Sequence, residues 1–168
     1  DRSRHADIVS QIRKAGAALR MISDGDITAA VAPSLPLSGV DLYVGMGGSP
    51  EGILAAAALK CLGGDMQLRM WFDHERHAEH YREVASVMSE ENIKRIHRVD
   101  DLVIGDSALF CATGISDSAL LPGVKLIGHM AETHSILMRA RSGTVRHIQA
   151  LHQLDRKIVP LRESFLTL

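Results

Sequence analysis

The hydrophobic pattern of the chain changes about two thirds of the way along its 168 residues. Before that point, short apolar runs alternate with stretches that have the three- and four-residue spacing of an amphipathic helix. After it, β-rich runs follow one another with only short turns between them. Alternating strands and helices predict a largely parallel sheet with flanking helices, and the last third predicts C-terminal antiparallel strands added to that sheet. The sequence therefore predicts a single α/β domain over residues 1–168.

The elements follow from this pattern. The predicted helices cover residues 3–19, 27–31, 53–62 and 74–88. The predicted strands cover residues 21–23, 40–44, 66–72, 96–99 and 107–115, followed by runs at 125–130, 133–141 and 144–152. The turn between the last two runs, Arg141-Ser142-Gly143, is a hairpin signal.

Charge and composition exclude several classes of protein. Apolar residues make up 46 % and charged residues 23 %, and the formal net charge is −1. Such a balance gives no global attraction to nucleic acid or to an anionic membrane. No apolar run is long enough to span a bilayer, and the start is not signal-like. Cys61 and Cys111 lie in apolar surroundings, so we expect reduced core thiols in a cytoplasmic protein.

The segment LYVGMGGSPEG (42–52) joins a predicted strand to a predicted helix through three glycines. Glycines at this position allow backbone N–H groups to approach an anion at a helix N-terminus. The loop matches the dinucleotide fingerprint GxGxxG only in part, because Pro50 replaces the last glycine. Glu51 has two readings: a carboxylate that favours the helix dipole, or a ligand that holds a divalent cation against a phosphate. Spacing leaves these two readings open.

Three further clusters have both a functional and a structural reading. Asp24-Gly25-Asp26 is a pair of carboxylates suited to sugar hydroxyls or metal, and it is also an ordinary turn sequence. Arg2 and Arg4 form a basic cluster with His5; the guanidinium groups match phosphate oxygens, and the cluster also suits a solvated helix start. The histidine-rich segment 73–83 misses the HExxH zinc motif and is typical of a polar helix. A serine hydrolase is not indicated, because the chain has no GxSxG elbow.

Four stretches together resemble the C-terminal half of class II (GlpX-type) fructose-1,6-bisphosphatases, a family with members that also act on sedoheptulose-1,7-bisphosphate. These stretches are SDGDITAAV (23–31), VGMGGSPEGILAAAALKCLGGDMQ (44–67), DDLVIGDSALFCATGISD (100–117) and THSILMRARSGTVR (133–146). The resemblance implies half of a layered α/β/α/β/α sandwich. It also implies metal-dependent hydrolysis of the 1-phosphate of fructose-1,6-bisphosphate in gluconeogenesis, with Mn²⁺ or Mg²⁺ as the cofactor.

The same resemblance assigns roles to residues. Glu51 matches a metal ligand of the family, and it is the one catalytic residue that the chain is expected to supply. The matches to substrate-binding positions are Arg2, Ser3, Arg4, Asp24, Gly25, Asp26 and Gly48. The chain departs from the family at Ser118 and Ala119, where a glycine and an acidic residue are usual, and at Ser3, where proline is usual.

The chain begins at Asp1 without Met and is about half as long as members of the family it resembles. We therefore expect the N-terminal half, with the other metal carboxylates, to be absent and the chain alone to be inactive or nearly so. One glutamate does not complete a divalent-metal site. The expected partners are fructose-1,6-bisphosphate, the N-terminal half and further copies of the chain, since half a sandwich exposes an apolar face. Two alternatives remain: a non-catalytic sugar-phosphate-binding or assembly module, and a nucleotide-binding loop.

Overall fold

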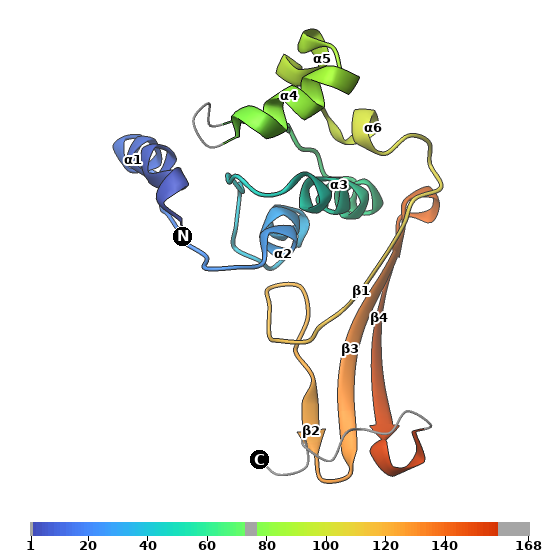
Figure 1. Cartoon of the computed structure of the whole chain (residues 1–168). Helices are drawn as coiled ribbons and strands as arrows, with labels where there is room; N and C mark the ends of the chain where they lie inside the picture. The colour runs from blue at the N-terminus through green and yellow to red at the C-terminus, as the bar shows by residue number, and fades with distance from the viewer. Residues whose placement is uncertain (1, 73–76, 158–168) are drawn as a thin grey trace.

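The computed structural model describes residues 2–72 and 77–157, and all structural statements refer to these residues. A group of helices leads into a long sheet that extends away from them (Figure 1). The α-helices are α1 (Ala6–Lys14), α2 (Asp26–Val31), α3 (Ser49–Leu62), α4 (Ala78–Val87), α5 (Glu90–Lys94) and α6 (Val99–Leu102). The 3₁₀ turns are η1 (Ser3–His5), η2 (Ala32–Ser34), η3 (Ala140–Ser142) and η4 (Leu154–Arg156). The strands are β1 (Leu109–Thr113), β2 (Lys125–Ile127), β3 (Met130–Arg139) and β4 (Thr144–Gln153).

Helix α3 links the cavity described below to the core. Pro50 lies in its first turn, where the missing N–H costs no hydrogen bond. Alanines fill its interior and favour the helical conformation. Gly63 ends it with φ +72°, a left-handed conformation that glycine adopts without steric cost. Because alanine is small, the buried side of α3 approaches α2 and the sheet closely; its buried residues are Ala55, Ala56, Ala58, Leu59 and Cys61.

Strand β3 is the centre of a four-stranded antiparallel sheet. Strand β4 pairs with β3 along its whole length, from Met130↔Gln153 to Arg139↔Thr144. On the other side of β3, β1 pairs with the end nearer the helices and β2 pairs with the far end (Figure 1). The turn between β3 and β4 ends at Gly143, whose φ of +56° gives the left-handed geometry that the hairpin requires.

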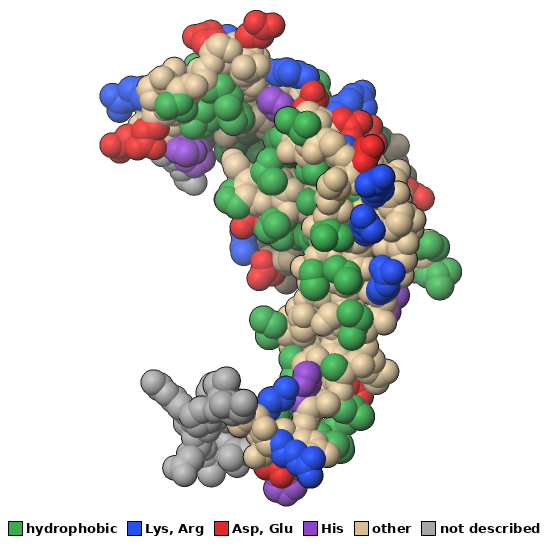
Figure 2. All heavy atoms as spheres, turned by 90° about the vertical axis from the view of Figure 1, so that its right-hand side faces the viewer, with side chains coloured by type: hydrophobic (Ala, Val, Ile, Leu, Met, Phe, Trp, Pro, Cys, Tyr) green, Lys and Arg blue, Asp and Glu red, His purple; other side chains and the backbone are tan. Residues whose placement is uncertain are grey.

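The core lies between α2, α3 and one face of the sheet, and its buried residues are Val31, Ala58, Cys61, Phe110, Leu121, Ile136 and Met138. Opposed residues share a face of a sheet. Phe110 and Met138 therefore point together into the core, whereas Cys111 and Leu137 lie on the opposite face. Exposed hydrophobic side chains occur along the face drawn in Figure 2, interspersed with Lys and Arg.

The α/β class, the flanking helices and the C-terminal antiparallel strands are confirmed, but the predicted largely parallel sheet requires correction. Every strand pair within the described residues is antiparallel. Segments 40–44 and 66–72 form no regular strand, apart from one bridge between Leu68 and His97. A strand depends on a neighbour that satisfies its N–H and C=O groups, so apolar composition alone does not produce one. Leu42 in the first segment is 74 % exposed.

Several element boundaries also differ from the predictions. The predicted helix 3–19 ends at Lys14, because Gly16 adopts φ +74° and leaves the helical conformation. Residues 21–23 and 96–99 are not strands, and Val99 begins α6. Cys61 is buried as predicted, whereas Cys111 is exposed on the uncovered face of the sheet. Within the residues that the structure describes, the helices lack the length and apolar character needed to cross a membrane.

Candidate functional site

Three segments that are far apart in the sequence meet at one cavity of about 550 Å³. The turn η1, the start of α2 and the loop before α3 each contribute to it. Its lining residues are Arg4, Asp24, Gly25, Asp26, Ile27, Thr28, Gly47, Gly48 and Glu51. Six of the eight predicted site residues are in that set, so the fold brings them together, while their roles remain predictions. Arg2 and Ser3 do not line the cavity.

The Asp24–Asp26 turn has a conformation that only glycine adopts easily at its centre. Gly25 has φ +88° and precedes the first residue of α2. Its N–H donates to Oδ1 of Asp24 at 2.9 Å, and its carbonyl accepts from the Thr28 hydroxyl at 2.8 Å. These two bonds fix the turn, so Asp24 and Asp26 are presented to the same cavity.

The glycine loop lies directly against two of the cavity's carboxylates. A Cβ atom on Gly47 would lie 2.8 Å from Oδ2 of Asp26. A Cβ atom on Gly48 would collide with the carboxylate of Glu51, which folds back over the first turn of α3. Both glycines thus let a carboxylate side chain approach the loop backbone closely, and Glu51 lies at a helix N-terminus that favours negative charge. This arrangement fits both readings of Glu51 that the sequence left open.

Arg4 holds the glycine loop from across the cavity. Its Nε and Nη2 atoms donate to the Met46 carbonyl at 3.1 and 2.8 Å. The N–H of Met46 donates to Nε2 of His5 at 3.1 Å. A guanidinium has five N–H groups, so Arg4 retains donors beyond these two while it lines the cavity.

Tyr43 fixes the orientation of Asp26. Its hydroxyl donates to Oδ1 of Asp26 at 3.3 Å. Burial, followed by the negative charge of Asp26, raises the pKa of Tyr43 to about 12, so the hydroxyl stays protonated and remains a donor. The predicted site residues did not include Tyr43, His5, Gly47 and Thr28, although the sequence places His5 in the basic cluster with Arg4 and Gly47 in the glycine loop. Tyr43 and His5 act through contacts 17 and 41 residues away, for which a single sequence contains no signal.

The described residues do not complete a metal site. Asp24, Asp26 and Glu51 all line the cavity, yet no group of three or more His, Cys, Asp or Glu side chains among the described residues could hold a metal ion. Mg²⁺ and Ca²⁺ sites need six or more ligands, with waters or substrate oxygens often completing the set. The histidine-rich segment gives a polar helix, α4, whose His80 contacts Glu83 and Phe72; His74 lies outside the described residues. No catalytic step through a metal is therefore assigned to this chain.

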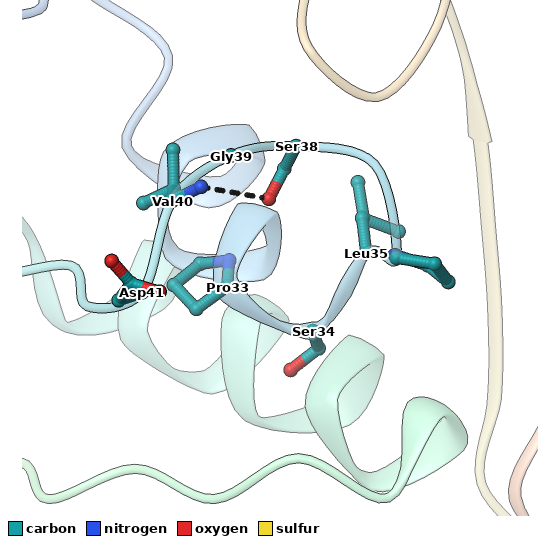
Figure 3. Close-up of a pocket in the computed structure, with 8 residues that line it drawn as sticks. Pro33, Ser34, Leu35, Ser38, Gly39, Val40 and Asp41 are labelled. Carbon is teal, nitrogen blue, oxygen red and sulfur yellow. Dashed lines mark hydrogen bonds between the residues drawn. The ribbon is translucent and has the colours of Figure 1, made fainter.

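A second cavity of about 310 Å³ lies along the loop after η2 (Figure 3). One continuous stretch, residues 33–36 and 38–41, forms its whole lining. Asp41 is the only charged residue in that lining, and the Val40 N–H bonds to the Ser38 hydroxyl within the loop at 3.2 Å. It combines no separate segments, so the cavity at Arg4, Asp24–Asp26 and Glu51 is the better candidate for a binding site.

Comparisons with known proteins show the family to which the chain is similar. A sequence profile of bacterial fructose-1,6-bisphosphatases encoded by glpX matches residues 1–152. The chain is 36 % identical over 163 residues to a D-fructose 1,6-bisphosphatase class 2/sedoheptulose 1,7-bisphosphatase of Synechococcus sp. (strain JA-3-3Ab), covering 92 % of this chain and 47 % of that relative. It is 39 % identical over 160 residues to a fructose-1,6-bisphosphatase class 2 of Haemophilus influenzae, covering 90 % of this chain and 48 % of that relative.

The chain thus spans about half the length of the curated relatives it matches. The matched residues include the whole of the cavity lining and both hairpin strands up to residue 152. The chain belongs to the family of bacterial fructose-1,6-bisphosphatases encoded by glpX.

Proposed function

We propose that this chain forms the sugar-phosphate-binding part of a class II fructose-1,6-bisphosphatase, which releases the 1-phosphate of fructose-1,6-bisphosphate. One observation carries the proposal: η1, the Asp24–Asp26 turn and the loop before α3 converge on a single cavity. That cavity combines guanidinium, carboxylates and a helix N-terminus, the groups that a phosphorylated sugar requires. Relatives named for the fructose and sedoheptulose bisphosphates support the substrate class. We propose fructose-1,6-bisphosphate as the first substrate to test.

Within this proposal, each residue has a role suited to its chemistry. Arg4, with Arg2 from the same segment, binds the phosphate that is not cleaved. Asp24 and Asp26 accept hydrogen bonds from sugar hydroxyls, and Gly48 leaves room for the substrate at the start of α3. Glu51 supplies one carboxylate to Mn²⁺ or Mg²⁺. Since oxygen-rich sites of these cations need more ligands than one, the remaining ligands come from the part of the relatives that this chain does not span.

The proposal includes an association with that remaining part. Apolar side chains outside the core support it, among them Leu42, Leu109 and Ile148, which are 74 %, 65 % and 45 % exposed. Leu109 and Ile148 lie on the face of the sheet opposite the core. Exposed apolar groups that cluster on one face are typical of a surface that another chain or segment covers. A homo-oligomer is the alternative occupant of the same surface.

The test is phosphate release from fructose-1,6-bisphosphate with Mn²⁺ present. The chain is assayed alone and together with the remaining part of a full-length family member, expressed separately. We expect no turnover from the chain alone and turnover on mixing, which Glu51→Gln abolishes and Glu91→Gln on α5 leaves unchanged. Turnover by the chain alone at about 1 per second or more would overturn the division of the site between two parts.

A second candidate function is a sugar-phosphate-binding module without catalysis. It is favoured by the observation that the described residues contain no complete group of metal ligands. Titration calorimetry with fructose-1,6-bisphosphate distinguishes the two. Binding that is equally tight with Mn²⁺ and with a chelator, together with no turnover after mixing, supports the module; Mn²⁺-dependent turnover after mixing supports the enzyme.

A further inference from the structure

Met46, in the middle of the glycine loop, is held at both of its backbone polar groups by one short turn. Its carbonyl accepts two hydrogen bonds from Arg4, at 3.1 and 2.8 Å. Its N–H donates to Nε2 of His5 at 3.1 Å. Arg4 and His5 both belong to η1, which is 41 residues away in the sequence. Two consecutive side chains therefore fix both hydrogen-bonding groups of one loop residue.

The contact with Met46 assigns the acceptor role to Nε2 of His5. A backbone N–H group can only donate, so the Nε2 atom that receives it carries no hydrogen. The tautomer that fits this contact has its proton on Nδ1. An imidazolium has N–H groups at both positions and would direct one of them at the N–H of Met46.

The loop needs this support because of its composition. Gly45, Gly47 and Gly48 surround Met46, and glycine has the widest range of accessible backbone conformations. Gly47 lies against Asp26, and Gly48 precedes α3 beside Glu51. A change in the conformation at Met46 would therefore move the loop relative to both carboxylates.

We propose that His5 is a positioning residue: as a neutral acceptor for the Met46 N–H, it holds the glycine loop in the conformation that receives the sugar phosphate. The effect on ligand binding rests on the proposed function. His5 does not line the cavity, so it acts through the loop, not by touching the substrate. Arg4 shares this task through the Met46 carbonyl, in addition to its proposed contact with phosphate.

Two variants of the 168-residue chain separate positioning from general stability. His5→Leu removes the acceptor and keeps an apolar side chain of similar reach. His5→Gln keeps an acceptor, because the amide oxygen of glutamine reaches about as far as Nε2. The matched control is His147→Leu, which removes an exposed histidine on β4.

The first readout is nuclear magnetic resonance of the imidazole nitrogens and of the Met46 amide. We expect a neutral His5 with a proton on Nδ1, and amide exchange at Met46 that is about five- to tenfold faster in His5→Leu and close to wild type in His5→Gln. A proton on Nε2 of His5 in the wild type would show that His5 does not accept from the Met46 N–H. An unchanged rate of Met46 amide exchange in His5→Leu would show the same.

The second readout is the affinity for fructose-1,6-bisphosphate. We expect His5→Leu to weaken binding about five- to tenfold, His5→Gln to restore it to within about twofold, and His147→Leu to leave it unchanged. Equal affinity in the wild type and His5→Leu would overturn the positioning role. If the wild type itself binds no sugar phosphate, the proposed function fails, and the Met46 exchange rates alone decide whether His5 holds the loop.

Discussion

Tyr43 and Gly47 lie on two sides of Asp26: the tyrosine hydroxyl donates to Oδ1 at 3.3 Å, and a Cβ atom added to Gly47 would lie 2.8 Å from Oδ2. One carboxylate oxygen is thus occupied by a protein donor, and the other lies at the glycine loop. Asp26 also lines the cavity at the start of α2. Its orientation is therefore determined by residues from the loop before α3, which couples the two halves of the site.

Removing the Tyr43 hydroxyl tests this coupling. We expect Tyr43→Phe to lower the free energy of unfolding by about 1 kcal/mol, the usual net value of one hydrogen bond, and to weaken fructose-1,6-bisphosphate binding. Urea unfolding and titration calorimetry measure the two effects. Tyr81→Phe on α4 is the matched control for binding, because Tyr81 lies outside the cavity. Unchanged affinity in Tyr43→Phe would mean that Asp26 is held without it.

The titration of Tyr43 gives a separate prediction. Its pKa is raised from 10.0 to about 12, chiefly by burial and then by Asp26. The folded state favours the protonated phenol of Tyr43. The contribution of Tyr43 to the free energy of unfolding is therefore complete below pH 10 and is lost as the pH rises toward 12. Phenolate absorbance should show a step near pH 12 that is missing in Tyr43→Phe, provided that the chain remains folded by circular dichroism. Phenolate absorbance that rises in a single step near pH 10 would contradict the raised pKa of Tyr43.

Alanine substitutions at Gly47 and Gly114 distinguish a glycine needed for ligand binding from a glycine needed for a stable fold. Alanine at Gly47 meets Asp26 Oδ2, the end of a flexible side chain, so we expect the free energy of unfolding to change by less than about 1 kcal/mol and ligand affinity to fall. Alanine at buried Gly114 collides with the backbone carbonyl of Pro122, which cannot rotate away. We expect Gly114→Ala to destabilise the fold by about 2 kcal/mol or more. Equal losses of stability in the two variants would contradict this distinction; urea unfolding measures both.

The parts of the fold that the sequence predicts correctly are those determined by local chemistry. Helix α3 follows from its alanines, Pro50 and Gly63, and the β3–β4 hairpin follows from two strand-like runs and Gly143. Segment 40–44 has an equally apolar sequence, but its pairing depends on partners elsewhere, and the described residues provide none. A single sequence does not contain that information.

The same division applies to the candidate site. Residue types and the family resemblance predict Asp24, Asp26, Gly48 and Glu51 as site residues; all four line the cavity, and their roles stay predictions. Their supports were missed, since nothing near Tyr43 in the sequence indicates that its hydroxyl meets Asp26. The guanidinium of Arg4 was expected at a phosphate, and the structure adds a contact with the Met46 carbonyl that its sequence gave no reason to expect.

A hydrogen-bonded pair of side chains on β3, Glu132 and His134, predicts a pH dependence of stability. Glu132 accepts from Nε2 of His134 at 2.7 Å, and both side chains are less than 20 % exposed. The hydrogen bond from His134, followed by one from Gln149, lowers the pKa of Glu132 below its ordinary 4.5. Because the folded-state pKa is lowered, the stability contributed by the carboxylate is present above pH 4.5 and is lost as the pH falls through the folded-state value.

Thermal unfolding from pH 7 to pH 3 measures this effect. We expect Glu132→Gln to unfold at a lower temperature than the wild type at pH 7, and the gap to close as the pH falls. The exposed Glu91 on α5 provides the control, since Glu91→Gln should follow the wild-type curve throughout. A gap that stays constant down to pH 3 would mean that packing, and not the charge of Glu132, produces the difference.

Added metal tests whether Glu51 binds a cation without further ligands. Among the described residues, no group of three or more potential ligands is close enough to hold a metal ion. A ligand raises the unfolding temperature only when its concentration exceeds its dissociation constant for the folded state. We therefore expect about 1 mM Mn²⁺, or its removal by a chelator, to change the unfolding temperature of the chain by less than about 1 °C. A rise with Mn²⁺ that disappears in Glu51→Gln but persists in Glu91→Gln would show that Asp24, Asp26 and Glu51 rearrange into a site within this chain. The carboxylates of the cavity would then be sufficient to hold the metal, and the proposed division of the metal site between two parts would be wrong.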